Sequence, residues 1–317
     1  MRHTLAHLLA VGAALALCTP FAHAQRVPFN PSDTDPFTAE GLLKGVSASA
    51  EQCAALPQAV WARTGTGAAE CIRYWMAGPR PGGPTPRMLV YIPSDQMAFD
   101  RPEAGYTSSS PQTLQRLSDA AGTRLGVPYV LLSRPGIFGS SGEHTQRRRE
   151  LEPRLMNAAL DELKARHGIA EFVLAGLSGG GHIVASLLGW RSDIVCAVPA
   201  SAVSSPRLRW QGLGRSTDLT GFADSYEPVD HLPTSAAVFH PKLRVFVLGD
   251  PKDGNVPWST QTPLAKRLKD IGVATELLTG EGSDGQRHVL GGSAQQVGAM
   301  CLKDAPTPEI RTLPRVG

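Results

Sequence analysis

The sequence predicts an α/β fold with a mostly parallel central sheet and helices on both faces. Segments with strand character alternate with segments of helical spacing along most of the 317 residues. The strand segments are continuous apolar runs rather than alternating apolar and polar positions, which is typical of strands buried on both faces. Hydrophobic residues make up 42% of the chain, enough for a sizeable core.

The strands are expected where short apolar runs stand between turn-forming residues. In chain order they are residues 70–76, 88–92, 128–133, 171–176, 194–200, 243–250 and 274–279. The helices are expected where apolar residues recur at helical spacing, and Gly126 and Gly168 end two of them. They are residues 113–126, 152–168, 180–190, 260–272 and, near the C-terminus, 292–302.

Segments rich in Pro, Gly, Asp and Thr are expected to be irregular. They are an N-terminal arm at 25–45, loops at 78–87 and 134–150, and an insertion at 201–240 with one short helix near 226–232. No internal repeat and no linker divides the chain after the first 24 residues. We therefore expect residues 25–317 to form a single domain with a small insertion near 201–240.

The first 24 residues have the pattern of a secretory signal peptide. Arg2 supplies a positive start, residues 8–17 form an apolar core, and Ala-His-Ala at 22–24 is a small-x-small cleavage site. Cleavage is expected before Gln25. We therefore expect a secreted or periplasmic protein.

The charge balance argues against large polyanionic or membrane partners. The chain carries 31 Lys and Arg against 28 Asp and Glu, so its net charge of +3 attracts neither strongly. No segment after the signal region has an apolar run of the length that a transmembrane helix needs. The expected partner is a small molecule, with no nucleic acid and no membrane.

Export changes how the cysteines are interpreted. Once the signal region is removed, four cysteines remain, and an even number in an oxidising compartment favours disulfides: Cys53, Cys71, Cys196 and Cys301. Three pairings are possible. A Cys53–Cys71 bond would be a local staple, and Cys196–Cys301 would then tie a central strand to the last helix. Because no CxxC or tight Cys/His spacing is present, no metal site is expected.

The segment GLSGG at 176–180 is the strongest local signal in the chain. It matches G-x-S-x-G and stands between an expected strand and an expected helix, which is the context of a serine nucleophile on a sharp turn. Glycines are needed there because side chains two positions away would collide with neighbouring backbone. The alternative is that Ser178 is a helix N-cap in an ordinary turn.

A serine nucleophile needs a histidine base and a carboxylate that orients it. The chain order expected on this fold is serine, acid, histidine. His182 lies on the helix after Ser178 and is expected to pack there, while His231 and His240 fall in or near the insertion. His288, in a glycine-rich loop after the last expected strand, is the preferred base.

The acid is expected in the loop that follows the strand at 243–250. Asp253 is the preferred candidate because it precedes Gly-Asn-Val-Pro and the next helix. Asp250, closer to the strand, is the alternative acid, and its other expected role is to brace the loop.

These segments resemble the α/β-hydrolase superfamily. The resemblance is carried by GLSGG around Ser178, GDPKDGNVP around Asp253 and GQRH at His288, and it covers about residues 85–301. The pattern around Asp253 is most similar to the prolyl-oligopeptidase and dienelactone-hydrolase branches. The resemblance implies acyl transfer through a serine ester without a metal or organic cofactor.

The oxyanion donors are expected from backbone N–H groups. Gly179, directly after the serine, is the first. Many relatives have His-Gly after the strand that corresponds to 88–92, whereas this chain has Pro-Ser-Asp-Gln, so the second donor is expected from Asp95 or Gln96. Arg134 is expected to brace its loop or to hold a substrate carboxylate. The arginines at 147–149 are expected to be a solvated lead-in to a helix.

Together these residues predict an exported serine hydrolase that cleaves carboxylic esters through an acyl-serine intermediate. A serine peptidase similar to the prolyl-oligopeptidase aminopeptidases is the main alternative, with a short peptide as substrate. A non-catalytic binding protein on the same scaffold is the other alternative.

Overall fold

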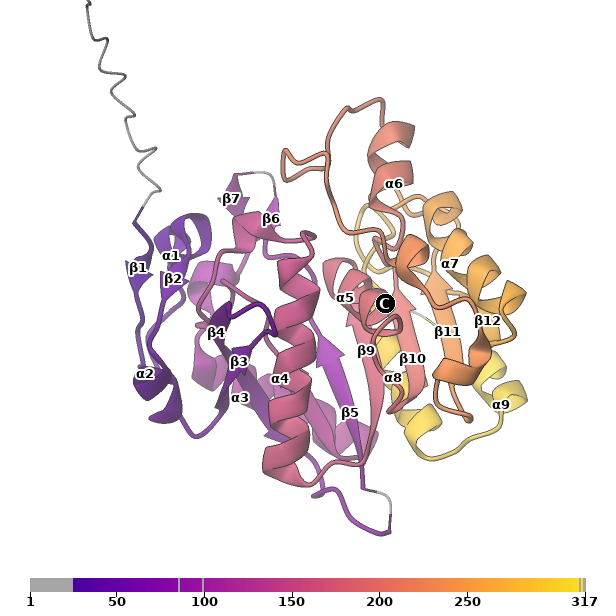
Figure 1. Ribbon diagram of the computed structural model, residues 1–317, viewed down its shortest axis with the longest axis horizontal. Helices are drawn as coiled ribbons and strands as arrows, with labels where there is room; N and C mark the ends of the chain where they lie inside the picture. The colour runs from indigo at the N-terminus through magenta and orange to yellow at the C-terminus, as the bar shows by residue number, and fades with distance from the viewer. Residues whose placement is uncertain (1–24, 85, 99, 314, 316–317) are drawn as a thin grey trace, which may run out of the picture.

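A computed structural model describes residues 25–84, 86–98, 100–313 and 315. The expected signal peptide at 1–24 lies outside the described residues. The arrangement is a twisted sheet with helices against both faces (Figure 1). This is the mixed α/β architecture that the alternation of apolar strands and amphipathic helices predicts.

The central sheet has the strand order β12-β11-β10-β9-β5-β8-β4-β3. Its strands are β3 (Ala59–Arg63), β4 (Ala69–Ala77), β5 (Arg87–Ile92), β8 (Tyr129–Leu132), β9 (Glu171–Leu177), β10 (Ile194–Ala200), β11 (Arg244–Gly249) and β12 (Ala274–Thr279). From β8 to β12 every neighbouring pair is parallel, and within the described part of this sheet only β4 with β8 and β3 with β4 run antiparallel. The sheet is therefore mostly parallel, as expected.

Helices cover the sheet on two sides. They are α1 (Ala39–Lys44), α2 (Ala50–Ala54), α3 (Pro111–Leu125), α4 (Leu151–His167), α5 (Gly179–Leu187), α6 (Pro206–Gly212), α7 (Trp258–Asp270), α8 (Gly291–Leu302) and α9 (Thr307–Thr312). Apolar side chains of α3 and α8 pack in one buried cluster, and those of α4, α5 and α7 pack in another. Because successive strand residues point to opposite faces, the two clusters fill opposite faces of one sheet.

The N-terminal arm is more regular than expected. β1 (Val27–Pro28) pairs in parallel with β2 (Val46–Ser47), and α1 lies between them. Thr38 caps α1 by accepting a hydrogen bond from the Gly41 N–H at 3.0 Å. The expectation of an irregular arm at 25–45 was therefore wrong for residues 27–28 and 39–44, because α1 has only six residues, too few to show a helical period.

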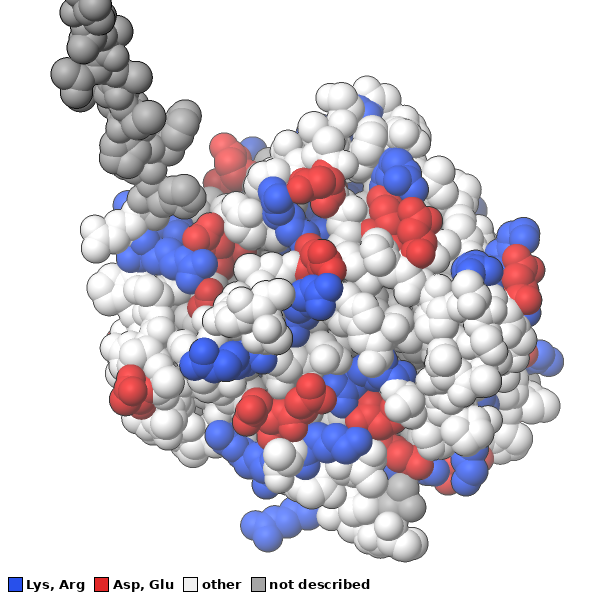
Figure 2. Space-filling model, viewed as in Figure 1, with Lys and Arg blue, Asp and Glu red and all other residues white. Residues whose placement is uncertain are grey.

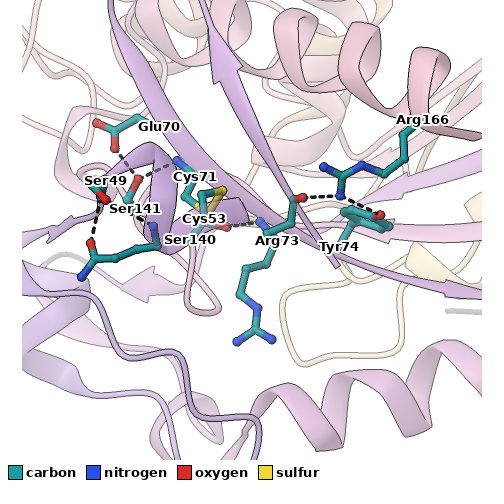
Figure 3. Close-up of a disulfide and its surroundings, with 11 residues drawn as sticks. Ser49, Cys53, Glu70, Cys71, Arg73, Tyr74, Ser140, Ser141 and Arg166 are labelled. Atoms are coloured by element: carbon teal, nitrogen blue, oxygen red, sulfur yellow. Dashed lines mark hydrogen bonds between the residues drawn. A yellow bond between two sulfur atoms is a disulfide. The ribbon is translucent and has the colours of Figure 1, made fainter. Parts of the chain in front are cut away.

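Two disulfides join helices to strands of the central sheet. Cys53 of α2 bonds Cys71 of β4, and Cys196 of β10 bonds Cys301 of α8. Around the first, Ser141 accepts a hydrogen bond from the Cys71 N–H at 2.7 Å and donates one to Glu70 at 2.5 Å (Figure 3). Of the three possible pairings, this is the one that combines a local staple with a strand-to-helix tie.

Two short segments stand above the carboxyl edge of the sheet. One is the antiparallel pair β6 (Met97–Ala98) and β7 (Arg101–Pro102), and the other is the insertion at 201–240 that contains α6. Figure 1 shows them at the same end of the molecule, on either side of the region above α5. Within the described part of the chain, no helix has both the length and the apolar character needed to cross a bilayer.

Candidate active site

Ser178 lies on a strained turn between β9 and α5. Its backbone has φ 56° and ψ −113°, in the left-handed half of the map that residues with a side chain rarely adopt. The turn is held from both sides, because the Ser178 N–H donates to the Ala200 carbonyl at 2.8 Å and its carbonyl accepts from His182 N–H at 2.9 Å. A backbone fixed in this way fits a serine that must stand clear of the sheet.

The glycines around Ser178 are required by close backbone approach. A Cβ on Gly176 would lie 2.5 Å from the Gly180 carbonyl oxygen, and a Cβ on Gly180 would overlap the Ile92 carbonyl oxygen. A Cβ on Gly179 would overlap the Asp95 carboxylate. The sequence pattern therefore has the expected cause: α5 packs against the ends of β9 and β5 at distances that only glycine allows.

His288 and Asp253 are in contact. Nδ1 of His288 lies 2.8 Å from Oδ2 of Asp253, whose side chain is fully buried. The other carboxylate oxygen, Oδ1, accepts the N–H groups of Asn255 and Val256, each at 2.8 Å. An ionised carboxylate at this position makes Nδ1 the protonated nitrogen of the neutral imidazole. Nε2 is then the basic nitrogen, and it is buried with no hydrogen-bond partner among the described residues.

The loop that carries His288 is fixed at several points. Ser201 donates to the His288 carbonyl at 2.7 Å, and Oδ1 of Asp284 accepts the His288 N–H at 2.6 Å. Oδ2 of Asp250 accepts the Gly282 N–H at 3.0 Å and Nε of Arg287 at 2.7 Å. Asp250, the alternative acid, therefore braces the loop and does not contact the imidazole through any hydrogen bond between described residues.

The other histidines after Ser178 lie away from this arrangement. His182 is buried, and its Nδ1 lies 2.9 Å from the Val203 carbonyl oxygen, so Nδ1 carries the proton. Burial lowers the pKa of His182 to about 4, which keeps it neutral at physiological pH. His231 bonds the Glu227 carbonyl, and His240 lies 3.1 Å from Glu171 at the far end of β9.

A cleft of about 680 Å³ brings the two predicted residues Ser178 and His288 to one surface. Its lining includes residues of the loop after β5, of β6, and of α6 and the rest of the insertion. Ser178 and His288 follow the carboxyl ends of β9 and β12, where ligands bind in open parallel sheets. The site thus lies where the fold class places active sites.

Behind this cleft lies a buried network of charged groups, which we call the arginine network. Its members are linked by ion pairs: Arg134, Arg147, Arg148, Arg209, Asp95, Glu152 and Asp218. Arg134 is fully buried and binds Glu152 through Nη2 at 2.6 Å and Nε at 2.9 Å, and its Nη1 reaches Asp95 at 2.9 Å. Arg134 therefore braces its loop and is not available to a substrate.

The arginines at 147–149 are not a solvated lead-in, and that expectation was wrong for two of them. Arg147 and Arg148 are 3% and 1% exposed, whereas Arg149 is half-exposed and pairs with Asp224. Arg148 pairs with both Asp95 and Asp218, the latter at 2.5 Å. Carboxylates brought from distant parts of the chain make the burial of these guanidinium groups possible.

The charges of the network set the ionisation of its members. Burial alone would raise the pKa of Asp95, but the charges of Arg148, Arg134 and Arg147 outweigh it and hold that pKa well below its usual range. Burial lowers the pKa of His144 well below its ordinary value, and the same arginines lower it further. Asp95 is therefore ionised and His144 neutral at physiological pH.

The backbone N–H groups of Gly179 and Gln96, both expected as oxyanion donors, differ in their hydrogen bonds. Gly179 is the first residue of α5, where the backbone N–H has no partner within the helix. The N–H of Gln96 instead donates to Nε2 of His144 at 3.2 Å, and the Gln96 side-chain amide bonds the Ser94 and Asp95 carbonyls. Gln96 is thus on the cleft wall, but its N–H is already bonded.

The described residues contain no group of three or more His, Cys, Asp or Glu side chains placed to hold a metal ion. Charged side chains on the surface are mixed. On the face drawn in Figure 2, Lys and Arg are interspersed with Asp and Glu.

No family model and no curated protein matches this sequence. Solved structures do match. Est1E from Butyrivibrio proteoclasticus, in a structure with ferulic acid bound, aligns with a TM-score of 0.51 and 13% identity over 78% of this chain and 98% of Est1E. A puromycin-hydrolyzing peptidase of Mycobacterium tuberculosis aligns with a TM-score of 0.52 and 17% identity over 77% of this chain.

A structure from work on two prolyl endopeptidases aligns with a TM-score of 0.50 and 16% identity over 82% of this chain. The chain spans 40% of the length of the Mycobacterium peptidase and 37% of that of the prolyl endopeptidase. At such identities the alignments show the fold, and the chain has the α/β-hydrolase fold.

Proposed function

We propose that this chain, an α/β hydrolase by fold, is an exported serine hydrolase that cleaves carboxylic esters through an acyl-serine intermediate. The observation that carries the proposal is the pairing of His288 with Asp253 in the same cleft that Ser178 enters from its strained turn. Nδ1 of His288 is committed to the carboxylate, so Nε2 is the nitrogen left for the serine hydroxyl.

In the proposed reaction, Oγ of Ser178 attacks the ester carbonyl carbon while Nε2 of His288 takes the hydroxyl proton. The same nitrogen then protonates the leaving alkoxide as the bond between the acyl carbon and the alcohol oxygen breaks. A water molecule, deprotonated by Nε2, hydrolyses the acyl-serine in the same way. Asp253 stays ionised and stabilises the imidazolium that forms in both halves.

The Gly179 N–H and the N-terminal end of α5 are the proposed stabilisers of the negative charge on the carbonyl oxygen. The second donor was expected from Asp95 or Gln96. Because the Gln96 N–H already bonds His144 at 3.2 Å, we assign the oxyanion to Gly179 and assign no second donor.

The test compares Ser178→Ala with Ser186→Ala. Ser186 is a buried serine on α5, the helix that follows Ser178, and its hydroxyl bonds the His182 carbonyl, away from the cleft. Turnover of p-nitrophenyl butyrate and labelling by a fluorophosphonate should be lost in Ser178→Ala and kept in Ser186→Ala, with the label on Ser178 by peptide mass spectrometry. Full esterase activity in Ser178→Ala would overturn the mechanism.

The same residues can act on an amide, so the assay includes an aminoacyl p-nitroanilide beside the ester. A higher kcat/KM for the anilide would make the chain a peptidase, the alternative expected from the sequence. No turnover of either substrate together with no label on Ser178 would leave a binding protein on a hydrolase scaffold.

Export is part of the proposal. The two disulfides support it, because such bonds persist in oxidising compartments. The positive, apolar and small-residue pattern of the first 24 residues supports it as well. N-terminal sequencing of the protein expressed in a bacterial host should give Gln25 as the first residue, recovered from the periplasm or the medium.

A further inference from the structure

The arginine network beside the cleft carries more positive than negative charge. Four guanidinium groups are linked by ion pairs to only three carboxylates, those of Asp95, Glu152 and Asp218. His144, whose backbone carbonyl accepts a hydrogen bond from Arg147, is neutral because burial and the nearby arginines lower its pKa. One buried positive charge therefore has no counter-charge within the network, and burying such a charge is costly unless a partner joins it.

Two arginines of the network have the weakest pairing. Arg147 reaches the Asp95 carboxylate only at 3.3 Å, and its other contacts are the His144 carbonyl and the Met97 sulfur. Arg209 lies 3.9 Å from Asp218 and otherwise bonds the backbone and side-chain oxygens of Asn255. Arg147 thus has one carboxylate at hydrogen-bonding distance and Arg209 has none, whereas Arg134 and Arg148 each bind two.

The pKa values of the four arginines separate Arg147 and Arg209 from Arg134 and Arg148. Burial lowers the pKa of Arg147 and lowers that of Arg209 to about 10, and the nearby charge of Arg148 adds to both effects. For Arg134 and Arg148, burial acts in the same direction, but the paired carboxylates raise the pKa above its usual value. The charge of Asp253 also raises the pKa of Arg209, but the Asp253 carboxylate bonds His288, Asn255 and Val256 and forms no ion pair with Arg209. Arg147 and Arg209 are thus the two arginines at which a further negative charge would be best accommodated.

Both of these arginines line the cleft that contains Ser178 and His288. Arg147 belongs to the segment before α4, and Arg209 lies on α6 in the insertion. The Asn255 that Arg209 binds is two residues from Asp253, so this wall is continuous with the proposed acid. An anion bound by these two side chains would lie in the same cleft as Ser178 and His288.

The other carboxylates on the cleft wall do not fill this role. Asp284 is held by the backbone N–H groups of His288 and Val289 at 2.6 and 2.8 Å and by that of Gln286. Glu103 is exposed to solvent at the rim. Neither is among the ion-pair partners of Arg147 or Arg209 in the described residues.

We propose that the cleft binds an ester substrate that carries a free carboxylate, and that Arg147 and Arg209 hold this carboxylate next to Ser178. The inference rests on the proposed function and names the substrate class of the same site. Guanidinium groups match a carboxylate in geometry and charge, and such hydrogen bonds are about twice as strong as neutral ones.

The test uses two matched ester pairs that place the carboxylate on either side of the scissile bond. One pair is the p-nitrophenyl half-ester of adipic acid and its analogue with a terminal carboxamide. The other is the butyrate ester of para-hydroxybenzoate and that of para-hydroxybenzamide. In at least one pair, kcat/KM should be about tenfold or more higher for the carboxylate than for the amide.

Variants then locate the effect. Arg147→Gln and Arg209→Gln should each lower the carboxylate-to-amide ratio of kcat/KM by about tenfold. Arg149→Gln and Arg207→Gln are the matched controls, because these neighbours are more exposed and pair with surface carboxylates. The controls should leave the ratio unchanged. Thermal unfolding checks that each variant is folded.

The outcomes separate this inference from the proposed function. One outcome is that the wild type cleaves the esters that carry a carboxamide, with Ser178 labelled, while the carboxylate-to-amide ratio of kcat/KM is near one in both pairs. In that case only the carboxylate inference is wrong. Equal loss of the ratio in the control variants would also overturn it, since a general surface field would then be the cause. No turnover and no label would overturn the proposed function, and the carboxylate inference with it.

Should the arginine variants fail to fold, inhibition of the wild type decides. Adipate should inhibit hydrolysis of p-nitrophenyl butyrate competitively, and adipamide should not. Equal inhibition by the two compounds, or none by adipate, would overturn the inference.

Discussion

The two disulfides should stabilise the protein to different extents, because their cysteines are almost equally buried but the loops that they close differ in length. Cys53–Cys71 closes a loop with a sequence separation of 18, and Cys196–Cys301 closes one of 105. All four cysteines are at most 2% exposed. Loop-closure entropy predicts stabilisation of about 3.2 kcal/mol for the shorter loop and about 4.8 kcal/mol for the longer one. The difference is about 1.6 kcal/mol, and it arises in the unfolded chain.

The assay is guanidinium unfolding of two double variants, C53A/C71A and C196A/C301A, without reductant. Because each variant removes the same atoms from a buried pair, the cavity terms are similar and the difference reports the loop term. The Cys196–Cys301 variant should lose about 1.6 kcal/mol more. Since the loops do not overlap, the quadruple variant should show the sum of both losses. Equal losses, or a larger loss for Cys53–Cys71, would refute the reasoning.

Three further predictions concern the site. Asp253→Asn should lower kcat on p-nitrophenyl butyrate by about 10⁴-fold, whereas Asp250→Asn, which only loosens a loop brace, should lower it far less. Gly180→Ala should destabilise the fold by about 1–3 kcal/mol in chemical denaturation, because the added Cβ overlaps the Ile92 carbonyl oxygen. The pKa of His182 is about 4 in the folded protein and about 6.5 in the unfolded chain. The free energy of unfolding should therefore fall by about 3 kcal/mol as the pH is lowered from about 6.5 to about 4. In that range the unfolded state binds more protons, so His182→Gln should flatten this part of the pH dependence of unfolding.

Each of these has a control and a contradicting result. A larger kcat loss in Asp250→Asn than in Asp253→Asn would exchange the roles of the two carboxylates. For the glycine, Gly292→Ala on α8 is the control, since its added Cβ meets no atom within 4 Å apart from its chain neighbours and its own helix backbone. Equal destabilisation by the two substitutions would refute the overlap argument. His231→Gln is the control variant for the pH dependence of unfolding. If the free energy of unfolding depends on pH in His182→Gln as it does in the wild type, the proton linkage is refuted.

The core of the fold could be predicted because its signals are local. The strands at 194–200 and 274–279 are bounded in the structure as expected, since each stands between turn residues. The first is a continuous apolar run, whereas the second mixes apolar and polar residues. The glycine pattern around Ser178 indicated backbone contacts that the structure contains. β3 (Ala59–Arg63), in contrast, was not expected, because this antiparallel edge strand mixes buried and exposed positions over only five residues.

The arginine network could not be predicted because its causes are distant in the chain. Arg148 is buried by pairing with Asp95 and Asp218, which are 53 and 70 residues away in sequence. A run of three arginines indicates a solvated face unless its partners are known. The bonded state of the Gln96 N–H has the same origin, because His144 reaches it from 48 residues away.

The loop that carries His288 lies between Cys196 and Cys301 in the sequence, and the disulfide joins the chain before this loop to the chain after it. A protease that cuts between β12 and α8 would therefore not release the C-terminal piece. The nicked protein would run as one band on a non-reducing gel and as two after thiol treatment. A protein with this bond can be cut beside His288 and still keep the two fragments that carry Ser178 and His288 attached to one another.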